Sequence, residues 1–334
     1  MVSAVIFVAT SCVSPLTGFA FWETNLAYEG ESIYNYLQVK NLFDRTILST
    51  NVLFGVQSVT MKDKGLTGMY YDTALAAPAL ADNANSALIL GMGTGTYARQ
   101  LKQYYPKMNI TGVEIDQKIT DLAGEYFDEP ADIPVTTYDG RAWLAASHDK
   151  YDVIMVDAYQ DITIPFQMSS TEFFTMVREH LNPGGVMVVN MNMISDGQGS
   201  INEALSDTIA SVFGNGNTLT ADVPNTTNRE LFAKKPGSGS EENSMQQASK
   251  ALNLRETTYE RTGSEDLEWY MEEVASRFRK VNEPDSASTI LTDDKAPVEV
   301  LGMHAIDQII ADEAGPNRQI LKDEGFGGLL RAVQ

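Results

Sequence analysis

Short apolar runs alternate with amphipathic segments through the middle of the chain. The runs fall at residues 87–90, 112–116, 133–137, 151–157 and 186–190. Helical periodicity between and after them is clearest at residues 170–181, 201–213 and 267–281, and Asn-Pro-Gly-Gly at 182–185 predicts a turn. Strands buried on both faces read as continuous apolar runs. The pattern therefore predicts an α/β fold, a doubly wound, Rossmann-like parallel sheet.

The first apolar run ends in three alternate glycines, Gly91, Gly93 and Gly95. Glycines let a backbone pass close under a ligand, where a Cβ atom would clash. A dinucleotide site would place its third glycine at Thr96, so the spacing instead favours an S-adenosylmethionine (SAM) type nucleoside. Glu114 lies in the second run, at the tip of the second predicted strand, where an acid can bind both ribose hydroxyls. The alternative is a glycine-rich turn without a ligand.

Two later strands also end in acids. Asp139-Gly140 follows the third strand, and an acid there can accept a hydrogen bond from an adenine amine. Asp157 ends the fourth strand. Ligands of doubly wound sheets bind beyond the carboxyl ends of the strands, so these residues are expected to share one site with the glycine loop. The alternative for Asp157 is an acid that caps a turn.

The pattern divides the chain into three parts: residues 1–23, a small β domain at 24–80 with alternating polar and apolar positions, and an α/β domain at 81–334. Residues 2–22 carry no charge and are long enough to span a bilayer. We therefore expect a membrane-associated protein with its catalytic domain in the cytoplasm. A soluble cytoplasmic protein, with this segment buried or forming a dimer contact, is the alternative.

Acidic residues outnumber basic ones by 45 to 24, which gives a net charge of −21. This excess disfavours nucleic acid, because its phosphates would be repelled. It suits a cationic polyamine, although a well-solvated acidic surface explains it equally well. The lone Cys12 excludes an internal disulfide framework, and the three histidines have no ligand spacing, so no metal site is expected.

Residues 24–192 resemble the spermidine synthase (polyamine aminopropyltransferase) family, which has the SAM-methyltransferase fold. They are most similar to its membrane-linked branch, the fused transporter/spermidine synthases. The motifs that carry this resemblance are E-S-I-Y-N-Y-L-Q-V at 31–39, Y-Y-D at 70–72, Y-D-V-I-M-V-D at 151–157 and L-N-P-G-G at 181–185. In the tail, L-T-D-D-K-A-P-V-E at 291–299 resembles a closing segment of the membrane-linked branch.

The resemblance implies transfer of an aminopropyl group from decarboxylated SAM, a co-substrate, to a polyamine. It implies that Asp157 helps to deprotonate the attacking amine. The nucleoside would be bound at Gly91, Gly93, Thr94, Gly95, Glu114, Asp139 and Gly140. We also expect a homodimer.

The chain departs from the family at the positions that line the donor and amine pockets. Thr94 replaces the acid of the family's G-D-G, which pairs with the donor's amine. The family's D-S-S-D reads here as Asp157-Ala-Tyr-Gln160, followed by Asp161. The remaining substrate-binding candidates are Tyr34, Asn35, Tyr70, Tyr71 and Asp72. These changes leave two alternatives open: a SAM-dependent methyltransferase, and a non-catalytic nucleoside or polyamine sensor attached to a membrane protein.

Overall fold

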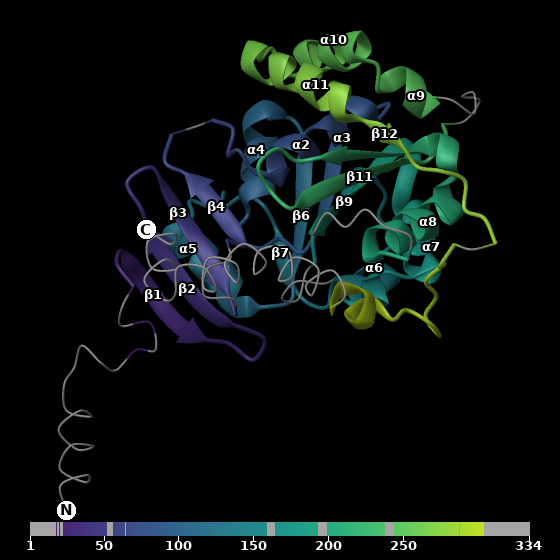
Figure 1. The fold of residues 1–334 in the computed structure, drawn as a ribbon. Helices are drawn as coiled ribbons and strands as arrows, with labels where there is room; N and C mark the ends of the chain where they lie inside the picture. Colours follow the sequence, from purple (N-terminus) through teal and green to yellow (C-terminus); the bar gives the residue numbers. More distant parts are fainter. Residues whose placement is uncertain are drawn as a thin grey trace, which may run out of the picture.

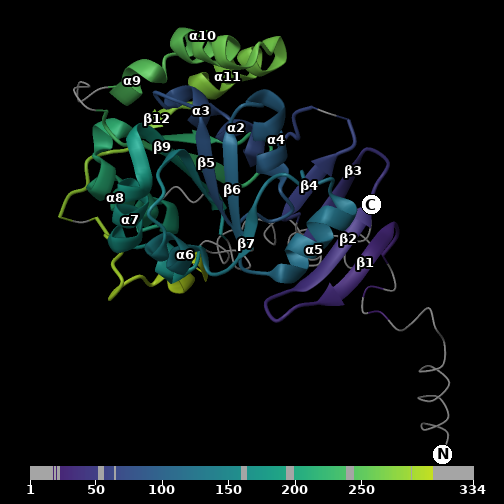
Figure 2. The same cartoon turned by 180° about the vertical axis from the view of Figure 1, so that it is seen from behind.

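The computed structural model describes residues 18, 20, 23–51, 56–63, 65–158, 164–192, 199–237, 244–286 and 288–303. Within them, a small antiparallel sheet precedes a large mixed sheet that carries helices on both faces (Figures 1 and 2). The strands of the small sheet are β1 (Leu26–Glu31), β2 (Tyr36–Asn41), β3 (Arg45–Thr50) and β4 (Ser58–Met61).

The large sheet has the strand order β12-β10-β11-β9-β8-β5-β6-β7. In chain order its strands are β5 (Ser86–Leu90), β6 (Asn109–Glu114), β7 (Val135–Thr137), β8 (Tyr151–Val156), β9 (Leu181–Asn192), β10 (Thr218–Asp222), β11 (Asn228–Lys234) and β12 (Arg279–Lys280). The five from β5 to β9 are parallel, and the last three pair antiparallel. The chain reverses its direction of winding between β5 and β8, which is where such sheets bind ligands.

Two layers of helices cover the sheet. One face is covered by α2 (Tyr70–Ala74), α3 (Ala76–Leu80), α4 (Thr96–Tyr104), α9 (Ser244–Ala248), α10 (Ala251–Thr262) and α11 (Glu265–Arg277). The other face is covered by α6 (Gly140–Ala146), α7 (Thr171–His180) and α8 (Ile201–Phe213). The short turns η2 (Phe166–Met168) and η3 (Asn215–Asn217) precede α7 and β10. Figure 1 shows α10 and α11 as an outer layer beyond α2 and α3.

The small sheet is fixed to the large domain through α5 (Gln117–Tyr126). Leu37 and Leu48 of the small sheet form an apolar cluster with Leu122 of this helix and with Phe127 just after it. This packing holds β2, β3 and β4 beside the carboxyl ends of β5 and β6, so the small sheet forms one wall of the site described below.

The structure confirms the α/β fold class, with a methyltransferase-type sheet and a small amino-terminal β sheet. Several expected boundaries differ. The turn expected at 182–185 lies inside β9, where Gly184 has a φ of 77° and the pairing with β8 shifts register. The helix expected at 267–281 is α11, which ends at Arg277 because β12 follows.

The expectation of a membrane-associated protein is wrong. In the part of the chain that the structure describes, every helix is too short or too polar to cross a bilayer. Except for Gly18 and Ala20, the uncharged segment at 2–22 lies outside the described residues, as does Cys12.

Candidate active site

A pocket of about 570 Å³ opens at the carboxyl ends of the parallel strands. Its volume is within the range of about 300–1,000 Å³ that small-molecule sites occupy. It is surrounded by the small sheet, the β5–α4 and β6–α5 loops and the residues that follow β8. The lining residues are Tyr34, Asn35, Leu48, Thr50, Val56, Gln57, Ser58, Met69, Tyr70, Tyr71, Gly91, Met92, Gly93, Val113, Glu114, Ile115, Ile119, Tyr138, Asp139, Gly140, Asp157, Ala158, Pro165, Gln167, Met168, Asn190, Thr227 and Asn228.

The glycine loop requires glycine for a steric reason at its first position. Gly91 has a φ of 87°, and a Cβ atom built on it would lie 2.4 Å from the backbone oxygen of Asp157. Its amide donates to the Val113 carbonyl at 2.9 Å. The loop therefore passes directly over the end of β8, and Asp157, which follows β8, lies close to the loop.

Glu114 is buried at the end of β6, and its carboxylate organises the loop in front of it. One oxygen accepts a hydrogen bond from the Gly93 amide at 2.8 Å, and the other accepts one from the Asp116 amide at 3.0 Å. Burial raises the pKa of Glu114, and these backbone donors act in the opposite direction. Each carboxylate oxygen has a second lone pair, so the side chain can still accept bonds from a ligand's hydroxyls.

Asp116, the N-cap residue of α5, connects the end of β6 to the segment between β1 and β2 of the small sheet. Its carboxylate accepts hydrogen bonds from Ser32 Oγ at 2.6 Å and from Asn35 Nδ2 at 2.9 Å. Asn35 is thereby positioned at the pocket by an acid that lies more than 80 residues later in the chain.

Asp157 is held from two sides on the floor of the pocket. Tyr70 Oη donates to its Oδ2 at 2.6 Å, and Asn190 Nδ2 donates to its Oδ1 at 3.0 Å. Burial raises the pKa of Asp157 to about 7, although both hydrogen bonds favour the ionised form. A carboxyl group with this pKa can accept a proton and release it near neutral pH.

Tyr70 and Tyr71 both contribute to the wall above Asp157. Their ring centroids lie 4.0 Å apart. Tyr71 Oη donates to the Gln57 carbonyl at 3.0 Å. Burial raises the pKa of both phenols well above the ordinary value, so both stay protonated and act as hydrogen-bond donors.

Asp139 and Gly140 line the pocket where α6 begins. Asp139 caps this helix by accepting a hydrogen bond from the Ala142 amide at 2.7 Å. Its second carboxylate oxygen has no hydrogen bond to the described residues and can accept one from an amine. Tyr138 precedes it on the same wall.

Some of the residues expected at the site are not among those that line the pocket. Asp72 is fully buried, and its carboxylate accepts bonds from the Thr67 and Gly68 amides and from Gln100 Nε2. Thr94 and Gly95 belong to the glycine loop but do not line the pocket. Gln160 and Asp161 lie outside the described residues.

The pocket is acidic. Three carboxyl groups line it, those of Glu114, Asp139 and Asp157, and its described lining includes no lysine, arginine or histidine. Such a lining attracts cations and repels anions. Among the described residues, no cluster of three or more histidine, cysteine or acidic side chains could hold a metal ion.

Asn190 is a site residue that the sequence analysis did not single out. It ends the apolar run at 186–190, as Asp157 ends the run at 151–157, and β8 and β9 are parallel neighbours. Its position as a polar residue at the end of a buried strand could therefore have identified Asn190 as a site residue from the sequence. Its partner Asn228, which donates to Asn190 Oδ1 at 2.8 Å, begins β11, a strand that the sequence predicts only at residues 231–233.

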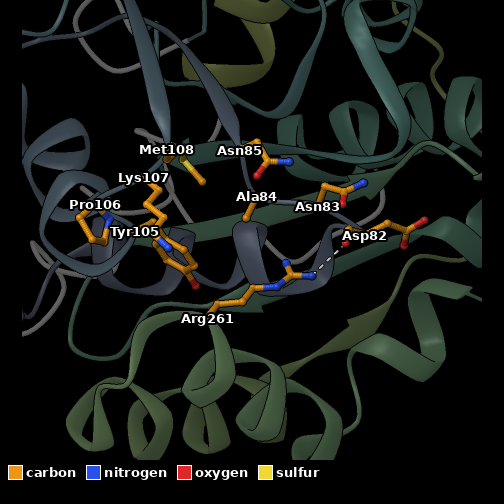
Figure 3. A pocket seen from close by; sticks show the side chains of 9 residues that line it. All are labelled: Asp82, Asn83, Ala84, Asn85, Tyr105, Pro106, Lys107, Met108 and Arg261. Atoms are coloured by element: carbon orange, nitrogen blue, oxygen red, sulfur yellow. Dashed lines mark hydrogen bonds between the residues drawn. The ribbon is translucent and has the colours of Figure 1, made fainter.

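A second pocket, of about 320 Å³, lies at the opposite edge of the sheet (Figure 3). It is formed by the loops that lead into β5 and β6 and by Arg261 of α10, whose guanidinium donates to the carbonyls of Ala81 and Asp82 at 3.0 Å. Ligands of this sheet type bind at the carboxyl edge. The larger pocket is therefore the candidate active site.

Comparisons with known proteins identify the family of the chain. A family model for the spermine/spermidine synthase domain matches residues 69–235, a range that includes the glycine loop, Glu114, Asp157 and Asn190. A protein of Bifidobacterium longum named "Probable polyamine aminopropyl transferase" is 99% identical over the whole chain, which spans 75% of that protein. A polyamine aminopropyltransferase of Vibrio vulnificus is 28% identical over 209 residues, 60% of this chain and 69% of that protein.

Solved structures show the same fold. A probable spermidine synthase from Corynebacterium glutamicum has a TM-score of 0.57 at 22% identity, over 80% of this chain and 99% of that one. A spermidine synthase in complex with the transition state analogue AdoDATO has a TM-score of 0.53 at 20% identity, over 64% of this chain and 75% of that one. These comparisons support the family, and give no support to the narrower membrane-linked branch. The chain belongs to the spermine/spermidine synthase family.

Proposed function

We propose that this chain is an aminopropyltransferase, which transfers the aminopropyl group of decarboxylated SAM to a polyamine. The observation that carries the proposal is Asp157, a buried carboxyl group held by Tyr70 and Asn190 on the floor of an acidic pocket, directly beneath the glycine loop. The relatives' names and the family match support the same reaction.

The charge of the pocket fits both substrates. Decarboxylated SAM carries a sulfonium and an ammonium group, and polyamines carry several ammonium groups. The carboxyl groups of Glu114, Asp139 and Asp157 would attract these cations, and the described lining has no cation to repel them. In this proposal Glu114 binds the ribose hydroxyls and Asp139 binds the adenine amine.

Asp157 would make the acceptor nucleophilic. An ammonium group has no lone pair, so its proton must leave before the nitrogen can attack. Asp157 accepts that proton. The nitrogen then forms a bond to the propyl carbon next to the sulfonium, the carbon–sulfur bond breaks, and its electron pair stays on sulfur as methylthioadenosine leaves. Tyr70 and Asn190 orient the carboxylate and keep part of it ionised despite burial.

Thr94 favours a second candidate, SAM-dependent methyl transfer. The Thr94 hydroxyl is buried without a hydrogen-bond partner among the described residues, and it supplies no charge for an amine. We expect a weaker preference for decarboxylated SAM over SAM than an acid at this position would give. Thr94→Asp should increase the preference, measured as the ratio of the two kcat/KM values. A preference unchanged by Thr94→Asp would place the amine elsewhere.

The homodimer expected from the sequence stays a proposal, which light scattering on the purified full chain tests. A monomer at micromolar concentration would contradict it.

The experiment for the proposed function separates binding from turnover. Asp157→Asn should bind methylthioadenosine as the parent does but lose transfer by about 10²–10⁴-fold, the usual contribution of a general base. Asp149→Asn removes an exposed carboxylate after α6 and is the matched control. If the parent binds SAM and decarboxylated SAM but alkylates no amine, the better explanation is a non-catalytic nucleoside or polyamine sensor.

A further inference from the structure

The segment at 291–299 has no role in the site described so far, and it lies outside the range that the family model matches. It folds back onto the second helical layer. Leu291 and Val298 are fully buried in the apolar cluster that α7 and α8 share with the sheet. The Leu291 amide donates to Thr208 Oγ1 at 2.9 Å, and its carbonyl accepts from the Thr171 amide at 2.9 Å.

Between these anchors the chain makes a tight turn that presents Asp293. Thr292 and Lys295 exchange backbone hydrogen bonds of 3.0 and 2.9 Å across it. Asp293 accepts two parallel bonds from the Arg141 guanidinium, Nη1 to Oδ1 at 2.7 Å and Nη2 to Oδ2 at 2.6 Å. Paired charge-assisted bonds of this kind fix direction as well as distance.

Two further contacts make this ion pair part of a network. Ser170 Oγ, which caps α7, donates to Asp293 Oδ1 at 2.5 Å. The Asp293 amide donates to Glu172 at 3.1 Å. An exposed ion pair alone contributes little, but a bidentate pair within a network holds its geometry. The Arg141 guanidinium accordingly holds the pKa of Asp293 below its usual range.

Arg141 connects this network to the pocket. It directly follows the wall residues Asp139 and Gly140 on α6, and its Nη1 also donates to the Gln167 carbonyl at 2.8 Å. Gln167 and Met168 also line the pocket, and a Cβ atom built on Gly140 would lie 3.5 Å from Met168 Cε. One guanidinium therefore joins two chain stretches that line the pocket, 138–140 and 165–168, and Asp293 fixes its orientation.

We propose that Asp293 is a positioning residue for nucleoside binding, which acts through Arg141 to hold the 138–140 and 165–168 walls at their separation. The role given to those walls rests on the proposed function. Asp293 is not among the residues that line the pocket, so the role we propose for it is indirect, through Arg141.

The test compares two neighbouring acids on one turn. Asp293→Asn keeps the size of the side chain but removes the charge, and we expect about a five- to tenfold higher Kd for methylthioadenosine, in the range of couplings within one network. KM for the donor should rise equally, while kcat at saturating donor stays within about twofold. Asp294→Asn is the control, because Asp294 is exposed and makes no hydrogen bond or ion pair with the described residues; it should change neither constant.

A double-mutant cycle distinguishes positioning from general loosening. If Asp293 acts through Arg141, the double variant Arg141→Gln/Asp293→Asn should bind the nucleoside no more weakly than Arg141→Gln alone, with thermal midpoints of all variants recorded alongside. Additive losses, or equal binding by Asp293→Asn and Asp294→Asn, would overturn the inference. Arg141→Lys, which keeps the charge but not the paired geometry, gives a second reading if Asp293→Asn does not fold. A parent that binds methylthioadenosine but transfers nothing would contradict the proposed function, and the binding measurements would still decide the inference.

Discussion

Tyr70 Oη lies 2.6 Å from Asp157 Oδ2 and donates a hydrogen bond to it, although the two residues are 87 positions apart in the chain. Tyr70 begins α2, and Asp157 follows β8. The bond therefore connects the helical layer to the floor of the pocket. It is made to a carboxyl group that burial would otherwise keep protonated, so it helps to set the charge of the proposed base.

Replacing this tyrosine should reduce turnover more than binding. Tyr70→Phe removes a donor to the carboxylate, and we expect kcat to fall about tenfold, the scale of one hydrogen bond to a charged group. The apparent pKa in the pH dependence of kcat should also rise, because the hydrogen bond from Tyr70 favours the ionised form of Asp157. Tyr105→Phe is the matched control, because Tyr105 is equally buried and its hydroxyl has no partner among the described residues. Equal effects of the two substitutions on kcat would contradict the role of Tyr70.

The rate of transfer should depend on pH through Asp157. The group accepts a proton only when ionised, and burial raises its pKa to about 7. The value of kcat/KM should therefore increase as the pH rises from 5.5 to 8, with an apparent midpoint of about 7. In Asp157→Asn, the residual activity should no longer show this increase of kcat/KM with pH. A rate that stays level down to pH 5.5 would mean that another group accepts the proton.

Glu114 should carry nucleoside affinity. Glu114→Ala would leave ribose hydroxyls and the Gly93 amide without acceptors, which should weaken methylthioadenosine binding by about 1–3 kcal/mol. Calorimetric titration measures this loss, and Glu125→Ala on the exposed side of α5 provides the comparison. Unchanged affinity in Glu114→Ala would show that the nucleoside is bound elsewhere.

Glu230 should lower the stability of the fold. It is fully buried on β11, and neither carboxyl oxygen has a hydrogen-bond partner among the described residues. Burial first, and then the charge of Asp157, raises its pKa well above the ordinary 4.5. Glu230→Leu removes this unpaired polar group, and we expect about 1–3 kcal/mol more free energy of unfolding at neutral pH.

The sign of the pH dependence follows from the raised pKa of Glu230. The unfolded chain releases this proton near pH 4.5, whereas the folded protein retains it to higher pH, so the parent loses stability as the pH rises above 4.5. The advantage of Glu230→Leu should therefore increase between pH 5 and pH 8 in urea unfolding. A constant difference, or a less stable variant, would show that the carboxyl group is stabilised by an interaction we have not identified.

The local pattern was sufficient for the residues at strand ends. Gly91, Glu114, Asp139 and Asp157 each follow an apolar run, and parallel strands bring their carboxyl ends together at one edge of the sheet. The alternation of strands and helices predicted the parallel, doubly wound part of the large sheet. These features depend on short stretches of chain whose periodicity is visible in the sequence.

Contacts between distant segments could not be read in the same way. Asp72 resembles a substrate-binding acid in its motif, but the Thr67–Gly68 turn and Gln100 take both of its oxygens. Arg141 and Asp293 are 152 positions apart, and neither motif indicates the other. The strand β10 was not predicted, because its position depends on pairing with β11 more than on its own short sequence. Such features depend on which groups the completed fold brings within hydrogen-bond distance.

The most direct test of the central claim is product analysis by mass spectrometry, with the purified full chain, a diamine acceptor and either decarboxylated SAM or SAM. The account predicts methylthioadenosine and an acceptor heavier by one aminopropyl group when decarboxylated SAM is supplied, and loss of both products in Asp157→Asn. Formation of S-adenosylhomocysteine and a methylated acceptor from SAM, with no aminopropyl product from decarboxylated SAM, would contradict it.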